Sequence, residues 1–248
     1  DIERKSARVE VTLGNITGRP GKGTLSAAGK SVPAQWDVGG GSARLEVPFG
    51  DEARLWDEFD PSLHHVTLTL SGDQADDERE LAVGLRRIES RNATFYVNGR
   101  KTFFRGTHEG CTFPLTGYPP TDVESWRKLF AVVKEYGLNH ARFHSWCPPE
   151  AAFSAADELG MYLHVEVSSW ANSSTTLGDG KPVDRWLYEE TDRILKAYGN
   201  HPSFVLMPYG NEPGGAKHKE FLAKWVDYCR AKDPRRLYTS GAGWPQLP

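Results

Sequence analysis

The chain has 248 residues, of which 38% are hydrophobic and 25% are charged, and its formal net charge is -3. This length accommodates one large domain or two ordinary ones. The balanced charge offers no electrostatic basis for binding nucleic acid or an anionic membrane, and no apolar run approaches the roughly 20 residues of a membrane-spanning helix. The three cysteines are widely separated and lack metal-type spacing, so neither a disulfide framework nor a zinc site is predicted.

Residues 1–90 show the pattern of a small β-sandwich domain. Short segments alternate apolar and polar side chains, and Gly, Pro, Asp and Ser separate them. The expected strands are residues 7–13, 23–29, 43–49, 65–72 and 80–89. Several short strands without a helical pattern are typical of an immunoglobulin-like sandwich.

From residue 91 onward, the pattern changes to strands that alternate with helices. Thr121 and Glu124 match a capping box at the start of the first helix, and Gly160 fits the end of the second. The repeat predicts a parallel sheet whose strands are apolar on both faces. The expected strands are residues 102–107, 138–144, 161–167, 203–210 and 236–243, and the expected helices are residues 121–137, 148–160, 184–199 and a region around 221–229.

Both a doubly wound sheet and a (β/α)8 barrel fit this alternation. No phosphate-binding glycine pattern follows the first strand, which disfavours a dinucleotide-binding sheet. A full barrel takes about 250 residues. The predicted fold is therefore an immunoglobulin-like β-sandwich over residues 1–90, followed over residues 91–248 by the N-terminal half of a (β/α)8 TIM barrel.

Polar, charged and aromatic side chains follow each expected strand of the second part. In a barrel, the carboxyl ends of the strands meet at one face and form the active site. Carboxylates supply acid and base, Arg and Asn donate to hydroxyl groups, and indole rings stack on sugars, so the set predicts a carbohydrate site. The candidate site residues are His108, Arg142, His144, Trp146, Glu166, Trp170, Asn211, Glu212 and Trp244.

Four segments resemble glycoside hydrolase family 2, the group of β-galactosidases, β-mannosidases and β-glucuronidases. The last of them contains the Asn-His-Pro-Ser and Gly-Asn-Glu signatures of that family. The resemblance extends over roughly residues 9–241. Its four segments are residues 55–70, 95–110, 139–166 and 199–213.

The resemblance implies a glycosidase that removes terminal β-linked sugars from glycosides or polysaccharides by a retaining mechanism, without a cofactor. It assigns Glu212 as the general acid/base, and Asn211 as the donor to the sugar 2-hydroxyl. Arg142 would support the catalytic carboxylates, while Glu166 would either contact the sugar or hold Arg142. The resemblance also favours a periplasmic or secreted location over a cytoplasmic one.

The chain departs from the family pattern in the loops that shape the pocket. It has His-Glu-Gly at residues 108–110, where many relatives have Asn-Arg-His. It has His-Ser-Trp-Cys-Pro at residues 144–148, where they have Ser-His-Tyr-Pro. These loops leave the identity of the sugar open.

The family's nucleophile, a second Glu after strand seven of the barrel, is expected outside these 248 residues. The charged N-terminus shows no leader pattern, as expected of a mature protein, a cytosolic protein or a piece of a longer one. We therefore expect an internal fragment of a larger polypeptide, inactive by itself. Its partners would be a carbohydrate substrate and the remainder of the same polypeptide, or a second copy that pairs along the open sheet edges.

Two alternatives stay open. One is a non-catalytic carbohydrate-binding or scaffold protein that retains the fold, although the adjacent Asn211 and Glu212 favour an enzyme, because a binding module needs no such acid. The other is a metal-dependent hydrolase, in which His108, His144 and Glu166 would form a ligand set at three strand ends.

Overall fold

The computed structural model describes residues 1–72 and 75–243 of the chain. Within this part, no helix combines the length and the apolar character needed to cross a membrane. The predicted site residue Trp244 lies outside the described residues.

The first compact unit consists of Asp1–Trp56 and Ser62–Arg86. Six strands form one antiparallel sheet in the order β1-β4-β3-β2-β5-β6. In β4 every second side chain is buried, so Ala43, Leu45 and Val47 face the core of this unit. The strands are β1 Ser6–Leu13, β2 Gly21–Ala27, β3 Lys30–Asp37, β4 Gly40–Pro48, β5 His64–Gly72 and β6 Ala75–Val83.

Strands β1, β2, β4 and β5 overlap the expected ones, but β3 was missed, and the expected strand 80–89 covers only the end of β6 and the start of β7 (Ile88–Arg91). β2 and β3 form a hairpin in which Ala27 is opposite Lys30. Its two turn residues, Ala28 and Gly29, both have positive φ, as a tight hairpin turn requires. An alanine in that conformation is unusual, which is why the sequence pattern concealed the turn. The specifically immunoglobulin-like arrangement stays a prediction.

The second compact unit consists of Asp57–Pro61 and the residues from Arg87 onward. It begins with a three-stranded antiparallel sheet that the sequence reading missed, formed by β7 Ile88–Arg91, β8 Thr94–Val97 and β9 Arg100–Thr102. Asn98 and Gly99, both with positive φ, turn the chain between β8 and β9. The Asn-Gly dipeptide is the sequence signal that could have revealed this hairpin.

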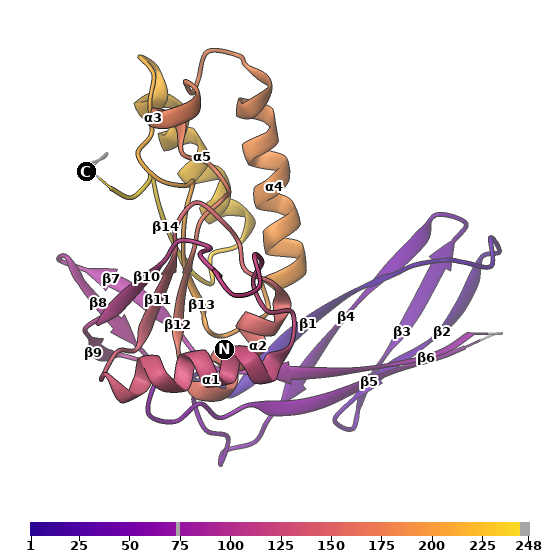
Figure 1. Ribbon diagram of the computed structural model, residues 1–248. Coiled ribbons are helices and arrows are strands. Elements are labelled where there is room, and N and C mark those ends of the chain that lie inside the picture. The colour runs from indigo at the N-terminus through magenta and orange to yellow at the C-terminus, as the bar shows by residue number, and fades with distance from the viewer. Residues whose placement is uncertain (73–74, 244–248) are drawn as a thin grey trace. The chain divides into compact units, whose positions relative to one another are not determined.

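A five-stranded parallel sheet follows, in the order β10-β11-β12-β13-β14, and Figure 1 shows these strands side by side with α4 alongside. The predicted alternation of strands and helices is confirmed, and sequential parallel neighbours are the arrangement of a barrel. The strands are β10 Gly106–Glu109, β11 His140–Phe143, β12 Tyr162–Val165, β13 Phe204–Pro208 and β14 Leu237–Thr239. The helices are α1 Val123–Glu135, α2 Glu150–Leu159, α3 Ala171–Ser174, α4 Pro182–Tyr198 and α5 His218–Lys232.

The first parallel strand begins later than predicted. Residues 102–107 were expected to form it, but Thr102 ends β9, and pairing with β11 starts only where Gly106 is opposite His140. The start of α1 also differs from the prediction. Asp122, rather than Thr121, is the N-cap, and its carboxylate accepts a hydrogen bond of 2.8 Å from the Ser125 N–H.

Strand β13 is apolar and buried at every position, as predicted, but β11 and β12 are not apolar on both faces. Ala141, Phe143, Leu163 and Val165 belong to the hydrophobic core that also contains the buried side chains of the helices. The alternate positions in β11 and β12 are polar, with Arg142 among them. Over β11 and β12, the sheet therefore has one apolar face, packed against helices, and one polar face.

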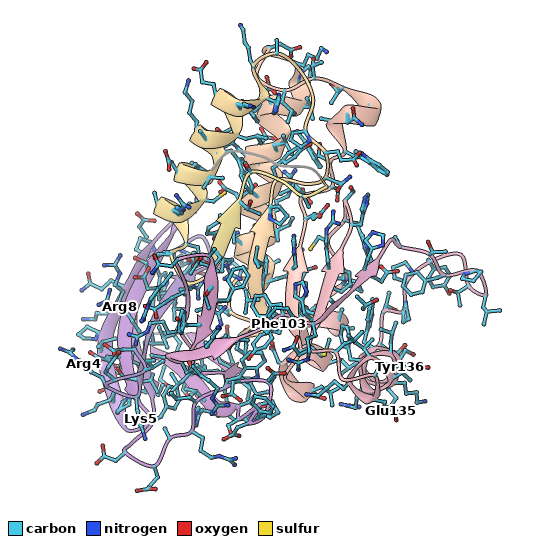
Figure 2. All side chains as sticks on the ribbon, turned by 90° about the vertical axis from the view of Figure 1, so that its left-hand side faces the viewer. Arg4, Lys5, Arg8, Phe103, Glu135 and Tyr136 are labelled. Atoms are coloured by element: carbon cyan, nitrogen blue, oxygen red, sulfur yellow. The ribbon has the colours of Figure 1, made fainter. Side chains whose placement is uncertain are left out.

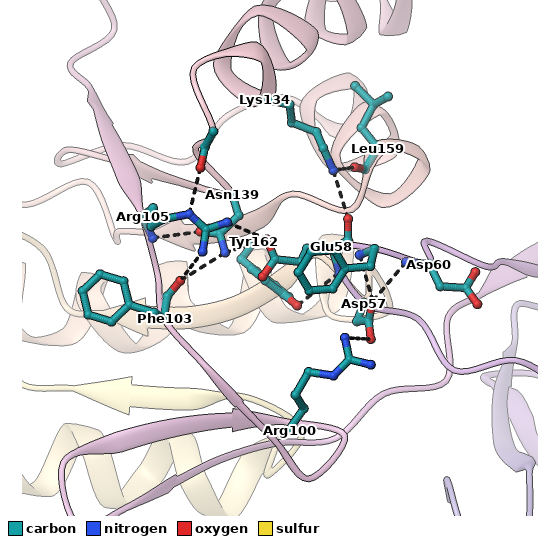
Figure 3. A network of polar contacts seen from close by, with 12 residues as sticks. Asp57, Glu58, Asp60, Arg100, Phe103, Arg105, Lys134, Asn139, Leu159 and Tyr162 are labelled. Atoms are coloured by element: carbon teal, nitrogen blue, oxygen red, sulfur yellow. Dashed lines mark hydrogen bonds and ion pairs between the residues drawn. The ribbon is translucent and has the colours of Figure 1, made fainter.

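At the opposite end of the sheet from the candidate site residues, the segment Asp57–Pro61 is held by the starts of the strands (Figure 3). The buried Glu58 carboxylate accepts hydrogen bonds from Asn139 Nδ2 at 2.8 Å and from Arg105 at 3.0 Å. Asn139 Oδ1 in turn accepts from the Arg105 N–H at 2.8 Å. These bonds fix the chain just before β10 and just before β11.

Replacement of Glu58 by Ala should destabilise the protein by about 2 kcal/mol, because Arg105 and Asn139 would lose a charged acceptor. Urea unfolding followed by tryptophan fluorescence measures this change. The control is Glu135→Ala at the end of α1, where the side chain points away from the ribbon (Figure 2). It should alter stability by less than about 0.5 kcal/mol. Equal effects of the two substitutions would contradict the role of Glu58.

Candidate active site

The register of the parallel sheet brings side chains of neighbouring strands into one row. His108 is opposite Arg142, and Arg142 is opposite His164. Beyond the strands, Asn211 forms parallel bridges with Trp170 on one side and Ala242 on the other. The carboxyl ends of the strands therefore meet as predicted, and the site is built from segments far apart in the sequence.

Arg142 connects the ends of three strands. Its Nε donates to Glu166 Oε1 at 2.7 Å, and its Nη2 donates to Asn211 Oδ1 at 2.7 Å. The other oxygen of Glu166 accepts from the Ser145 N–H at 2.6 Å, and the Glu166 side chain is fully buried. Because both oxygens are occupied, Glu166 holds Arg142 rather than presenting an oxygen to a ligand.

The orientation of the Asn211 amide follows from this contact. A guanidinium only donates hydrogen bonds, so the oxygen of the amide must face Arg142. The Asn211 Nδ2 group is thereby turned away from Arg142 as a donor. The residue is 2% exposed, which leaves little freedom to rotate. This is the donor that the family resemblance assigns to a sugar hydroxyl.

Gly210 and Glu212 make a sharp turn at the end of β13. Gly210 has a φ of 148°, and a Cβ atom there would overlap the carbonyl oxygen of Ser169. Glu212 has a φ of 38°, a left-handed conformation uncommon for a residue with a side chain. Two hydrogen bonds hold it: its N–H donates to Ala242 O at 2.8 Å, and its carbonyl accepts from the Asn172 N–H at 2.9 Å.

The Glu212 side chain is half-buried and held on one side. Its Oε2 accepts from Trp170 Nε1 at 2.7 Å and from Asn172 Nδ2 at 3.3 Å. Since Arg142 contacts the neighbouring Asn211, Arg142 and Glu212 lie at the same end of the sheet. The predicted barrel requires Arg142 and Glu212 to lie at the same end of the sheet.

Two histidines extend the cluster toward β10. The rings of His108 and His144 have centroids 4.9 Å apart, and the His144 ring lies edge-on to Trp170 at 4.6 Å. Partial burial, followed by the proximity of His144 and Arg142, lowers the pKa of His108. A neutral His108 both donates and accepts hydrogen bonds, which suits contact with a hydroxyl group.

Trp146 makes ring contacts other than those of the His108, His144 and Trp170 cluster, and its role as a sugar-binding residue stays a prediction. Its ring packs edge-on against Phe113 and Phe143, with centroids 6.4 Å and 5.3 Å away, and its Nε1 donates to Glu109 O. Phe143 is fully buried, so the indole serves the hydrophobic core. A tryptophan at a strand end suits either role, and only the direction of the ring distinguishes them.

The alternative metal site is not supported by the geometry. In residues 1–72 and 75–243, no group of three or more His, Cys, Asp or Glu side chains is arranged to hold a metal ion. Glu166, one of the three proposed ligands, is committed to Arg142 and the Ser145 N–H.

Asn172 contacts Glu212, and the sequence did not predict it as a site residue. It lies in the short helix α3 after β12, a region without a predicted element. Its proximity to Glu212 depends on the turn that brings Ala171–Ser174 beside the end of β13. No local sequence pattern signals that approach.

The fold agrees with comparisons to known proteins. The family model described as "Glycosyl hydrolases family 2, TIM barrel domain" matches residues 88–243, more than half of the chain. The chain therefore belongs to glycosyl hydrolase family 2, and the sequence-based recognition is confirmed.

Curated relatives include "Beta-galactosidase 2" of Enterobacter cloacae, which is 25% identical over 90% of this chain and 21% of its own length. A "Putative beta-glucuronidase" of Formosa agariphila is 26% identical over 83% of this chain and 19% of its own length. The chain thus spans about a fifth of these relatives. The solved structure of a family 2 β-galacturonidase from Eisenbergiella tayi, bound to galacturonate, has a TM-score of 0.78 at 20% identity, over 94% of this chain and 42% of that one.

Replacement of Glu166 by Gln should cost about 3 kcal/mol of stability, because it removes the charge that compensates Arg142 in a buried pair. The control is Glu109→Gln, since the Glu109 oxygens accept separate hydrogen bonds from the Cys111 and Thr112 N–H groups at a partly exposed position, and the amide oxygen of Gln can keep one of these bonds. Its expected cost is below about 1 kcal/mol. Chemical unfolding of both variants measures the difference, and equal costs would contradict the role of Glu166.

The histidines on the polar face of the sheet should make stability sensitive to acid. Burial, and then Arg142, lowers the pKa of His140 from 6.5 to about 4, and burial holds the pKa of His164 well below its usual value. The His140 and His164 Nε2 atoms are buried without a hydrogen-bond partner among the described residues. The folded protein therefore resists protonation of both rings.

The unfolded chain binds a proton at His140 at a higher pH than the folded chain does. The free energy of unfolding should therefore fall as the pH drops from about 6.5 to about 4. Below about pH 4, both states are protonated at His140, and this residue causes no further loss. The contribution of His140 is about 3 kcal/mol. His140→Phe, which keeps a ring stacked on Phe104, should flatten this slope in unfolding measurements between pH 4 and pH 7.5. An unchanged slope would show that His140 does not carry the effect.

Proposed function

We propose that this chain contributes the general acid/base and part of the sugar-binding site of a retaining glycosidase that removes terminal β-linked sugars. The observation that supports this most strongly is the Asn211–Glu212 turn. It places an amide donor and a carboxylate side by side at the end of a barrel strand, and both are held by hydrogen bonds. Curated relatives named as β-galactosidase and putative β-glucuronidase support the reaction class.

Glu212 acts twice in the proposed mechanism. In the first step, it donates a proton to the glycosidic oxygen while a second carboxylate attacks the anomeric carbon, and the aglycone leaves as an alcohol. In the second step, Glu212 takes a proton from water as the water oxygen attacks the anomeric carbon and displaces the second carboxylate. Asn211 Nδ2 donates to the sugar 2-hydroxyl, where a hydrogen bond strengthens in an oxocarbenium-like transition state.

The second carboxylate is expected outside the described residues. Retaining enzymes place the two carboxyl groups about 5–5.5 Å apart. Glu166 does not serve as this nucleophile, because the side chain is fully buried and both oxygens accept hydrogen bonds. By this proposal, the 248-residue chain without the second carboxylate has no hydrolytic activity.

The proposal does not choose between a neutral and an acidic sugar. Relatives and solved structures are named for galactoside, glucuronide and galacturonide substrates. His108 and His144, which differ from the common family pattern, lie in the same cluster as Trp170. A substrate panel with these three sugars, as 4-nitrophenyl β-glycosides, identifies the preferred one.

Glu212→Gln in the full-length enzyme should lower kcat/KM by about 10²–10⁴-fold on alkyl β-glycosides, whose leaving groups need a proton. The loss should be much smaller in the first step for 2,4-dinitrophenyl glycosides, whose leaving group departs without protonation. Azide needs no general base, so it should restore turnover of Glu212→Ala by forming a glycosyl azide. Steady-state kinetics and product analysis measure these effects.

Three outcomes would contradict the proposal. Near-wild-type rates of Glu212→Gln on both substrates would remove Glu212 from the mechanism. Turnover by the isolated 248-residue chain would show that it already holds a nucleophile. Sugar binding without hydrolysis by the full-length protein would favour the alternative, a non-catalytic carbohydrate-binding protein.

A further inference from the structure

The two oxygens of the Glu212 carboxylate have different surroundings. Oε2 accepts two hydrogen bonds, from Trp170 Nε1 at 2.7 Å and from Asn172 Nδ2 at 3.3 Å. Among the described residues, no donor forms a hydrogen bond with Oε1. The carboxylate is therefore held from one side only.

Backbone contacts hold both donors in place. The Asn211 N–H donates to Ser169 O, and Trp170 forms a parallel bridge with Asn211. The Asn172 N–H donates to the carbonyl of Glu212 itself. The segment that carries the two donors thus runs beside the segment that carries the acid, and their relative positions do not depend on flexible side chains alone.

On the other side of the carboxylate, the backbone of Gly243 lies close to the Glu212 side chain. A Cβ atom on Gly243 would lie 2.5 Å from Glu212 Cγ and 3.3 Å from Oε1. Any side chain at this position would crowd the free oxygen. Ala242, the residue before Gly243, bridges Asn211 on the side opposite Trp170, so Gly243 lies on the side of Glu212 away from Trp170.

We infer that Trp170 and Asn172 are positioning residues that hold Oε2, so that Oε1, the oxygen on the side of Gly243, carries the transferred proton. The inference rests on the proposed function of Glu212. It assigns Trp170 a task other than stacking on the sugar, which the sequence had suggested.

The chemistry of the donors supports this assignment. An indole N–H and an amide N–H only donate, and neither titrates in the working range of an enzyme. When Glu212 is protonated, Oε2, which accepts both hydrogen bonds, is favoured as the carbonyl oxygen. The hydroxyl group is then at Oε1. In the first step, the Oε1–H bond breaks as the glycosidic oxygen gains the proton. In the second, Oε1 regains a proton from the attacking water.

Trp170→Phe in the full-length enzyme tests the inference, because Phe keeps an aromatic ring and removes the N–H. The probes are methyl, 4-nitrophenyl and 2,4-dinitrophenyl β-glycosides of the preferred sugar. We expect kcat/KM to fall by about 10–100-fold on the methyl glycoside and by less than about 2-fold on the dinitrophenyl glycoside. The control, Trp36→Phe in the first compact unit, should change neither value.

A residue that stacks on the sugar would give a different result. All three probes share one sugar, so loss of stacking would lower kcat/KM equally across the series. A uniform loss would therefore overturn the inference. Asn172→Ala, at an exposed position, is the second variant and should show the same leaving-group dependence to a smaller extent, since its hydrogen bond is longer.

A double-mutant cycle shows whether Trp170 acts through Glu212. Trp170→Phe should cause no further loss on the methyl glycoside once Glu212 is replaced by Gln, and additive losses would contradict the inference. The two proposals fail differently. If Glu212→Gln lacks leaving-group dependence, the proposed function fails; if Glu212→Gln shows it and Trp170→Phe does not, only this inference fails.

Discussion

The contact between Arg142 and the buried carboxylate of Glu166 is the constraint on which the site depends. A fully buried carboxylate is costly unless its charge is compensated and its oxygens are occupied, and Glu166 meets both conditions through Arg142 and the Ser145 N–H. The same guanidinium then reaches Asn211. One ion pair therefore links the ends of β11, β12 and β13 and sets the direction of the Asn211 amide beside Glu212.

Arg142 lies on the polar face of β11 and β12, and this face accommodates the ion pair with Glu166. Strand positions alternate between a core shared with the helices, which contains Phe143 and Val165, and a face that carries His140, Arg142 and His164. Burial keeps the two histidines neutral by lowering their pKa values. The helix-facing side of β11 and β12 thus supplies apolar packing, and their other side carries polar groups that an apolar core would not tolerate.

The backbone contacts of Gly210 and Glu212 explain why the buried strand β13 ends in Gly-Asn-Glu. The chain approaches the Ser169 carbonyl too closely at Gly210 for any side chain, and Glu212 takes a left-handed conformation held by its neighbours on both sides. Such a turn aims the carboxylate out of the strand end. Because the backbone of Glu212 is hydrogen-bonded to Ala242 and Asn172, the position of Glu212 depends on three segments of the chain.

The sequence by itself determined the alternation of strands and helices, the family, and the strand ends at which site residues gather, because hydrophobic periodicity and short motifs are local. The resemblance to the family assigns roles to Glu212, Asn211 and Arg142, and these roles stay predictions. The three-dimensional contacts were needed to show that Trp146 packs against the core, that Trp170 and Asn172 donate to one oxygen of Glu212, and that residues 57–61 belong to the second compact unit. Ring directions, hydrogen-bond partners and contacts between distant segments depend on how the sheet brings those segments together, and no local pattern encodes that.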